Sequence, residues 1–213
     1  VEQENRSMIV NMLYLRKSLE RARERCRKLE EDAVELTEKS ERDPLTGLAN
    51  RYRLTNDSEK IVEQCFAEHK PLSFEILDID YFKQYNDRYG HQAGDDCVRA
   101  IAALIRQMES DQIFCARYGG DEFVIIYNGM SAEEVWERAE KLRQDVMALH
   151  IERRYAEGSF GVTISQGICH DIPSNGNKNW DFLHVADQAL YRVKRRGRNR
   201  LCMTDIHGRE IEV

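Results

Sequence analysis

The sequence predicts an α/β fold in which one layer of helices packs against a mixed β-sheet, preceded by a long coiled-coil helix. Three observations support this prediction. From residue 50 to residue 204, segments with the periodicity of amphipathic helices alternate with short apolar segments typical of strands. Residues 5–42 differ, because their apolar side chains recur every three or four positions throughout the segment. Apolar residues make up 41% of the 213 residues, which is enough to form a core.

The N-terminal segment, residues 1–42, is predicted to be a dimerisation stalk. Its apolar and small residues are spaced alternately four and three apart, as in a heptad repeat, at Met8, Met12, Leu15, Leu19, Ala22, Cys26, Leu29, Ala33 and Leu36. A stripe this narrow fits a second helix better than it fits a globular core. The sequence also allows an alternative, a single amphipathic helix that folds against its own domain.

The second predicted domain, residues 43–213, begins where Pro44 stops the stalk helix, since proline cannot continue the helical hydrogen bonds. Asn50 is a suitable cap for a helix that runs to about Phe66. The strongly apolar run from Leu72 to Asp80 predicts a strand.

The rest of this domain continues the alternation of helix and strand. The expected elements are, in order, helix 95–108, strand 113–118, strand 123–127, helix 131–148, strand 162–169, helix 181–195 and strand 201–204. Gly119 and Gly120, followed by two acidic residues, join the first two of these strands as a hairpin. Ser131, with Glu134 three residues later, predicts a capping box at the start of helix 131–148.

Composition excludes several classes of protein. The net charge of −6 is opposite in sign to that of most proteins that bind nucleic acid non-specifically. No apolar run is long enough to span a membrane, and the six cysteines form no C-x-x-C pair, which fits a reducing cytosol. The chain starts at Val1 without a signal peptide. We therefore expect a cytoplasmic fragment without direct membrane contact, although the full-length protein could be membrane-anchored.

Acidic residues gather at two strand ends. Asp78 and Asp80 lie on the same side of the predicted strand, and Asp121 and Glu122 follow the two glycines of the hairpin. Carboxylates at such places suit hard divalent cations such as Mg²⁺, which complete their shells with phosphate oxygens. Asp80 is the weakest candidate ligand and is expected to form an ion pair or a cap instead.

Basic residues complete this pattern downstream, in the segment from Lys194 to Arg198, which could hold a triphosphate. Acidic pair, glycine turn and basic helix end together predict a metal–nucleotide site. The glycine motifs of P-loop and dinucleotide-binding folds are absent from the sequence, which argues against those two nucleotide folds.

The segment Tyr-Gly-Gly-Asp-Glu-Phe at 118–123 resembles the signature of the GGDEF family, the diguanylate cyclases. Further segments match the family's motifs in order and at the family's spacing, from about Arg42 to Thr204: residues 43–51, 78–83, 86–91, 94–95, 162–165, 186–191 and 197–199. A lone signature would be weak evidence, whereas this ordered set identifies the chain as a member of the family.

The resemblance implies a mixed sheet with surrounding helices, similar to nucleotidyl cyclases and polymerase palms, that binds one GTP. Two such domains face each other, and each 3′-hydroxyl attacks the α-phosphate of the other GTP to give cyclic di-GMP and pyrophosphate. The partners implied are GTP and a second copy of the chain, paired through the N-terminal coiled coil. We also expect an upstream sensor module that this chain lacks, and no nucleic acid.

The resemblance also implies metal ligands. Asp78 and Asp121 would hold Mg²⁺, or alternatively Mn²⁺, with help from the backbone carbonyl of Ile79. Asp121 and Glu122 are the implied catalytic residues, and Glu122 would either bind a second metal or help to deprotonate the hydroxyl. Two metals would stabilise the attacking and leaving oxygens of an in-line displacement.

The residues implied to bind the substrate fall into two groups. Asn86 and Asp95 would contact the guanine. The phosphates would be bound by Lys83, Lys194 and Arg198, with backbone amides near Phe82 as further donors. A family subgroup that also uses ATP carries serine at the position of Asp95. A carboxylate accepts hydrogen bonds from guanine N1–H and N2–H₂, and adenine offers no such pair, so GTP is the expected substrate.

The sequence departs from the family pattern in one motif and at one further position. Many members carry an inhibitory Arg-x-x-Asp before the signature, where product binds. The family spacing places these two residues at Ser110 and Ile113, so feedback inhibition through that motif is not expected. Gln166 stands after Ser165, where the family usually has an apolar residue.

Two other classes of function stay open at the level of sequence. One is a non-catalytic module that binds GTP or cyclic di-GMP and signals through its stalk. The other is a coiled-coil interaction protein with an inert cap, which would bind no nucleotide. Survival of both signature carboxylates and both glycines favours the enzyme, because degenerate family members usually lose signature residues.

Overall fold

The structure is a computed structural model that describes residues 16–28, 41–152 and 161–213. It divides into two compact units, Val1–Glu41 and Arg42–Val213. In the first unit, residues 16–28 are helical and exposed, and they include Leu19 and two other positions of the predicted seam. The remaining seam positions lie outside the described residues. Within the described parts of the chain, no helix combines the length and apolar character needed to cross a bilayer.

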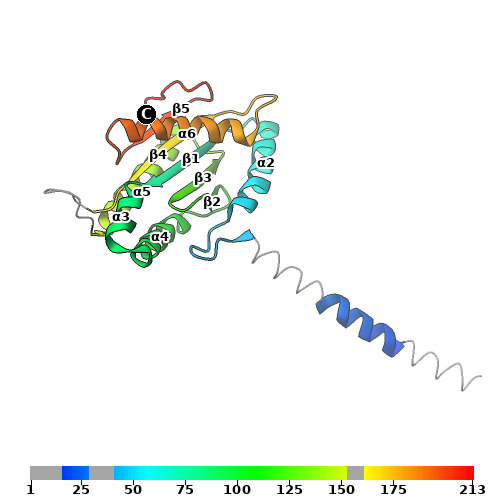
Figure 1. The fold of residues 1–213 in the computed structure, drawn as a ribbon. Coiled ribbons are helices and arrows are strands. Elements are labelled where there is room, and N and C mark those ends of the chain that lie inside the picture. Colours follow the sequence, from blue (N-terminus) through cyan, green and yellow to red (C-terminus); the bar gives the residue numbers. More distant parts are fainter. Residues whose placement is uncertain (1–15, 29–40, 153–160) are drawn as a thin grey trace, which may run out of the picture. The chain divides into compact units, whose positions relative to one another are not determined.

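The second unit is built on a five-stranded sheet with the strand order β2-β3-β1-β4-β5 (Figure 1). Its strands are β1 (Leu72–Ile79), β2 (Ile113–Arg117), β3 (Glu122–Asn128), β4 (Ile164–Asp171) and β5 (Leu201–Thr204). β1 is antiparallel to both of its neighbours, β2 and β3 form the predicted hairpin, and β4 and β5 run parallel. The sheet is therefore mixed, as expected.

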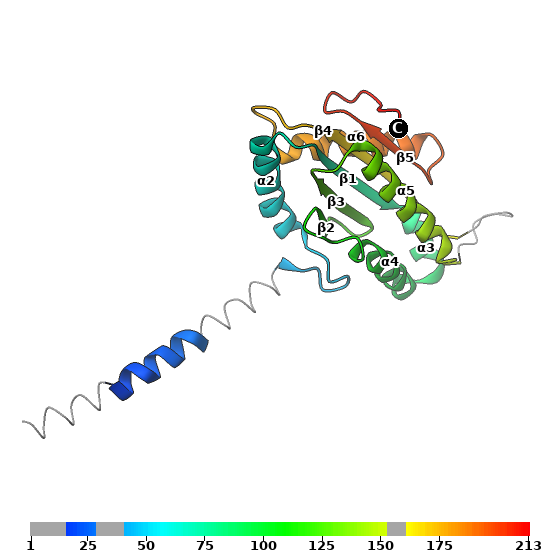
Figure 2. The same ribbon diagram turned by 180° about the vertical axis from the view of Figure 1, so that it is seen from behind.

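Helices cover both faces of the sheet, so the expectation of a single helical layer is wrong. α2 (Arg51–Glu68) and α6 (Asn179–Arg195) pack on one face, and α4 (His91–Arg106) and α5 (Ala132–Ala148) pack on the other. Figure 1 shows α6 in front of the sheet, and Figure 2 shows α5 in front in the reverse view. β1 is buried along nearly its whole length, and a strand that is buried on both faces needs two covering layers. The surrounding helices agree with the family resemblance.

The predicted helix starts are confirmed at two positions. The side chain of Asn50 accepts a hydrogen bond from Arg53 N at 3.0 Å, which caps α2. Ser131 and Glu134 form the expected capping box at α5, with both reciprocal bonds present. These local signals act within one turn of helix, which is why the sequence alone reveals them.

One helix was not expected, α3 (Phe82–Tyr89), and α4 starts at His91 rather than at about residue 95. α3 buries only Tyr85, and Tyr81 at its N-cap position makes no side-chain cap bond, so neither periodicity nor capping signals it. Gly90, with a φ of 85°, separates α3 from α4.

The structure explains Gln166, which lies in a buried polar network on the α5 side of the sheet. Gln166 Nε2 donates to Glu75 Oε1 at 2.7 Å and to the Ala139 carbonyl at 2.9 Å. The Tyr127 hydroxyl donates to Glu75 Oε2 at 2.6 Å. Burial raises the pKa of Glu75, because a charged carboxylate is costly without solvent. A polar residue at position 166 therefore provides a donor for a buried acid.

The close approach of β4 and α6 depends on Gly167. A Cβ at this position would lie 2.2 Å from Leu190 N and 2.3 Å from the Ala186 carbonyl oxygen, both backbone atoms. We therefore expect Gly167→Ala to lower the free energy of unfolding by about 2 kcal/mol or more, measured by denaturant unfolding. Gly120→Ala is the matched control, since a Cβ there meets nothing within 4 Å. Equal stability of the two variants would contradict this packing.

Candidate active site

The end of β1 lies beside the turn that joins β2 and β3. The register of β1 and β3 pairs Asp78 with Glu122, and Ile79 N donates to the Asp121 carbonyl at 3.2 Å. Inside the turn, Tyr118 N donates to the Glu122 carbonyl at 2.9 Å. Strand pairing thus brings the first acidic motif and the signature acids to one edge of the sheet, as the sequence predicted.

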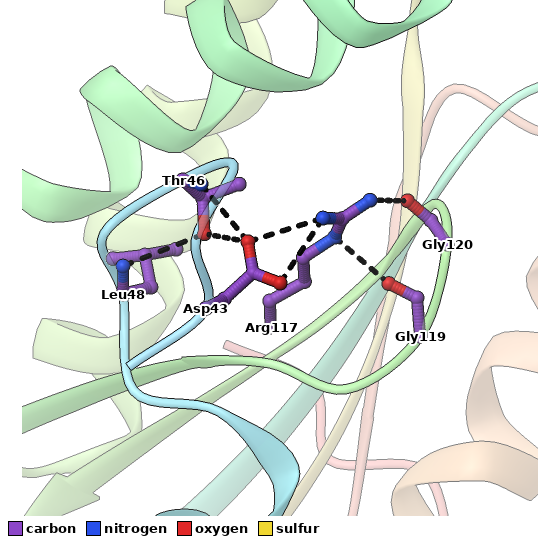
Figure 3. Close-up of polar contacts among 6 residues, drawn as sticks. All are labelled: Asp43, Thr46, Leu48, Arg117, Gly119 and Gly120. Carbon is purple, nitrogen blue, oxygen red and sulfur yellow. Dashed lines mark hydrogen bonds and ion pairs between the residues drawn. The ribbon is translucent and has the colours of Figure 1, made fainter. Parts of the chain in front are cut away.

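Arg117 binds the two glycine carbonyls of the signature turn, as Figure 3 shows. Its Nε donates to the Gly119 carbonyl at 3.0 Å, and its Nη2 donates to the Gly120 carbonyl at 2.8 Å. Its Nη1 contacts both carboxylate oxygens of Asp43, at 3.1 and 3.2 Å. One largely buried guanidinium therefore joins the start of the second unit to both signature glycines.

Asp43 is itself held by the loop that follows it. It accepts hydrogen bonds from Thr46 N at 2.9 Å and from Thr46 Oγ1 at 2.7 Å. Burial opposes the ionisation of Asp43, but the hydrogen bonds from Thr46 and Arg117 outweigh it and lower the pKa. Asp43 and Arg117 were not among the predicted site residues. Both stand in segments that match family motifs or adjoin them, but only the fold shows that they meet.

Asp78 is the most perturbed acid at this edge, with 13% of its side chain exposed. Burial, together with the charges of Asp121 and Glu122, raises the pKa of Asp78 to about 6, although Lys194 acts in the opposite direction. Lys194 Nζ, from the end of α6, lies 2.8 Å from Asp78 Oδ2. A cationic group therefore already contacts Asp78, as expected of a carboxylate surrounded by like charge.

Asn86 and Asp95 are brought together by the packing of α3 against α4. Asn86 Oδ1 is buried and has no hydrogen-bond partner among the residues described. A Cβ at position 94 would overlap this oxygen, so any residue larger than glycine there would displace the Asn86 side chain. Asp95 follows Gly94 directly and is half-buried. A buried acceptor without a partner is unusual, and it fits a recess that a polar ligand completes.

The predicted phosphate-binding residues are placed differently from one another. Lys194 and Arg198 both reach the end of β1: Lys194 through its ion pair with Asp78, and Arg198 through Tyr81, whose hydroxyl accepts from Arg198 Nη1 at 3.3 Å. Lys83 is exposed in the first turn of α3, next to the half-buried Phe82.

Asp80 does not join the acidic edge. It is fully buried and accepts hydrogen bonds from Thr163 Oγ1 at 2.7 Å, Ser165 Oγ at 2.7 Å and Asn199 N at 3.1 Å. These donors occupy its carboxylate in the manner of a cap, in line with the expectation that it is not a ligand.

In the described parts of the chain, no three acidic, histidine or cysteine side chains form a ready-made metal cluster. The carboxylates of Asp78, Asp121 and Glu122 nevertheless come from adjacent backbone positions at one edge. Oxygen donors of this kind fit Mg²⁺, which takes few protein ligands and fills its shell with water and phosphate oxygens. The contact of Lys194 with Asp78 is further evidence that this edge attracts positive charge.

Comparison with known proteins agrees with this arrangement. The family described as "Diguanylate cyclase, GGDEF domain" matches residues 40–200. That range includes every acidic and polar residue of the edge described above. The chain therefore belongs to the GGDEF family of diguanylate cyclases.

Individual relatives point the same way. A diguanylate cyclase from Vibrio cholerae is 35% identical over 182 residues, which are 81% of this chain and 53% of that protein. Diguanylate cyclase DgcP from Pseudomonas aeruginosa is 36% identical over 186 residues, covering 84% of this chain and 27% of DgcP. The chain thus spans about half of the length of the first relative and about a quarter of the second.

Solved structures share the fold. The coiled coil and GGDEF domain of DgcB from Caulobacter crescentus, in complex with c-di-GMP, is similar with a TM-score of 0.80 at 30% identity. The similarity covers 89% of this chain and 99% of the DgcB chain. The active GGEEF domain of a diguanylate cyclase from Vibrio cholerae has a TM-score of 0.64 at 33% identity, covering 73% of this chain and 97% of that one.

The raised pKa of Asp78 predicts that this residue costs stability. Its charged form is disfavoured in the fold, so the metal-free Asp78→Asn variant should have a higher melting temperature than wild type at pH 8. As pH falls from about 6 towards 4, the folded protein takes up the proton before the unfolded chain does, so wild type gains stability. The gap in melting temperature between the variant and wild type therefore narrows. Thermal unfolding across pH tests this prediction. A gap that stays constant or widens at low pH would contradict it.

The Arg117 network predicts strong coupling between Arg117 and Asp43. Arg117→Gln should lower the free energy of unfolding by about 1.5–3 kcal/mol, because charge-assisted hydrogen bonds to three groups are lost. In a double-mutant cycle with Asp43→Asn, the double variant should cost little more than the worse single one. Arg99→Gln is the control, since Arg99 is exposed and forms an ion pair with the exposed Asp96. Additive effects at positions 43 and 117 would show that the two side chains act independently.

Proposed function

We propose that this chain is a divalent-metal-dependent diguanylate cyclase that condenses two GTP molecules into cyclic di-GMP and pyrophosphate across a dimer. The observation that carries the proposal is the edge where Asp78 meets the signature turn, with a lysine against its carboxylate. Membership of the diguanylate cyclase family supports the same reaction.

In this proposal, Asp78, Asp121 and the Ile79 carbonyl hold Mg²⁺, or alternatively Mn²⁺. The metal would polarise phosphate oxygens and lower the barrier to displacement at the α-phosphate. Glu122, which pairs with Asp78 across the strands, either completes a second metal site or accepts the proton of the 3′-hydroxyl. The raised pKa of Asp78 supports a functional role, because a buried carboxylate near other acids gains most from binding a cation.

The guanine would lie in the recess between α3 and α4. The unpaired Asn86 Oδ1 would accept a hydrogen bond from the base, and the Asp95 carboxylate would accept those of guanine N1–H and N2–H₂. The triphosphate would extend toward the end of β1, where Lys194 and Arg198 supply positive charge, with Lys83 and the amides near Phe82 as further donors.

The product ring contains two nucleotides, and each domain binds one, so catalysis requires two domains. We propose residues 1–42 as a coiled-coil stalk that pairs two copies of the chain, and residues 43–213 as the catalytic domain. Pairing raises the effective concentration of one GTP-loaded domain at the other. The similar DgcB structure contains a coiled coil as well as a GGDEF domain, which supports this arrangement. A sensor upstream would act on the stalk. The reaction would take place in the cytoplasm, where GTP is available.

The direct test is incubation of the purified chain with GTP and Mg²⁺ over a range of protein concentrations. Cyclic di-GMP should form, and its rate per mole of protein should rise with concentration because the active species is a dimer. Asp78→Asn and Asp121→Asn should each lower turnover about 100-fold or more, since several kcal/mol of charge stabilisation are lost. Asp96→Asn is the matched control, an exposed acid on α4 that lies outside the edge.

Absence of cyclic di-GMP at every concentration would overturn the proposal. Binding of GTP without release of pyrophosphate would instead favour the non-catalytic signalling module. Failure to bind GTP at all would favour the interaction protein with an inert cap.

A further inference from the structure

Asp80 ties three separate segments together next to the proposed metal site. Its carboxylate accepts hydrogen bonds from two hydroxyls at the start of β4, Thr163 and Ser165, and from the backbone N–H of Asn199. It lies two residues after Asp78 and is 1% exposed. A buried carboxylate with three donors fixes the positions of those donors, because breaking any one of these bonds leaves buried charge less solvated.

The turn that Asp80 holds has an unfavourable backbone. Arg198 and Asn199 both have left-handed conformations, with φ values of 64° and 47°, and they follow Gly197. Left-handed residues other than glycine cost free energy and persist where the surroundings hold them. Besides the bond from its N–H to Asp80, Asn199 accepts a hydrogen bond at its Oδ1 from Arg143 Nη1 at 2.8 Å. The turn between α6 and β5 is thus held from two sides.

Tyr81 contacts the side chain of Arg198, which belongs to the turn between α6 and β5. The guanidinium of Arg198 lies 4.3 Å from the centroid of the Tyr81 ring, and its Nη1 donates to the Tyr81 hydroxyl at 3.3 Å. Tyr81 is also left-handed, with a φ of 58°, although 40% of the residue is exposed. The strained residue that follows Asp80 therefore places an aromatic face under an arginine from a segment more than a hundred positions away.

We propose that Asp80 and Tyr81 are positioning residues for phosphate recognition. Asp80 fixes the turn that carries Arg198, and Tyr81 holds the Arg198 guanidinium beside the end of β1. Because both residues directly follow Asp78 and Ile79, the spacing between the metal-binding acids and the phosphate-binding cation is set by one continuous segment. This inference rests on the proposed function, and it assigns to neither residue a contact with the substrate.

The test separates binding of phosphates from binding of the base. The affinity of a non-hydrolysable GTP analogue with an α,β-methylene bridge is measured by calorimetry in Mg²⁺, and that of guanosine by NMR titration. Tyr81→Leu should weaken binding of the analogue about three- to tenfold, because a partly exposed cation–π contact is lost. Tyr81→Phe should restore most of that affinity, since the ring remains. Guanosine should bind equally to all three proteins.

A matched control is available on α6, where Arg195 lies 5.9 Å from the ring centroid of the exposed Tyr191. Tyr191→Leu removes a tyrosine–arginine pair of the same kind and should leave the analogue's affinity unchanged. Asp80→Asn extends the test to the turn and should weaken the analogue tenfold or more with guanosine unaffected, while turnover shows a larger change in KM than in kcat.

Two results would overturn the inference: an unchanged affinity of Tyr81→Leu for the analogue, or a parallel loss of guanosine binding, which would indicate general disruption. Because Tyr81 is exposed, its variants keep the inference falsifiable even if Asp80→Asn fails to fold. In either case wild type would still make cyclic di-GMP, so the proposed function would stand. A wild-type chain that neither binds the analogue nor makes product would refute both.

Discussion

The pairing of β1 with β3 is the contact on which the rest of the site depends. Its register places Asp78 opposite Glu122, so acids from two motifs some forty residues apart in sequence share one sheet edge. Burial disfavours the charged form of Asp78, and repulsion by the like charges at this edge adds to that cost, so the pKa of Asp78 is raised. The fold bears that cost because β1 is the central strand, buried by helices on both faces. A cation bound at this edge would reduce the repulsion among the carboxylates of Asp78, Asp121 and Glu122. Without the cation, the stability of the packed core compensates for that repulsion.

Around this edge, two hydrogen-bonded anchors, Arg117 and Asp80, hold the turns that contain Gly119 and Asn199. Arg117 fixes the glycine turn through its carbonyls and connects it to Asp43, the second residue of the compact unit that follows the N-terminal segment. Asp80 fixes the turn after α6. Both anchors use charged side chains that are largely buried and fully engaged with donors or acceptors. Glycine-rich and left-handed segments lack a stable conformation of their own, so such anchors supply the order that a binding site requires.

Much of the fold and of the candidate site was predictable from sequence, for physical reasons that act locally. Capping at Asn50 and Ser131, the hairpin through the two glycines, and the strand 201–204 each depend on a few neighbouring residues. The candidate acids could be selected from the sequence because carboxylates beside glycines at strand ends suit hard divalent cations. The helix 82–89 escaped prediction, since only Tyr85 is buried and no side chain caps its start.

The sequence by itself determined the order of the helices and strands other than α3, the family, and the residue types that chemistry at this edge would need. Only the tertiary structure decided which distant residues meet: Gln166 with Glu75, and Arg117 with Asp43. It also decided that helices cover both faces of the sheet. The physical reason is that hydrophobic periodicity specifies which side of an element is buried, whereas the partner of a buried polar group depends on strand order and register. Those are set by the packing of the whole chain, not by any one segment.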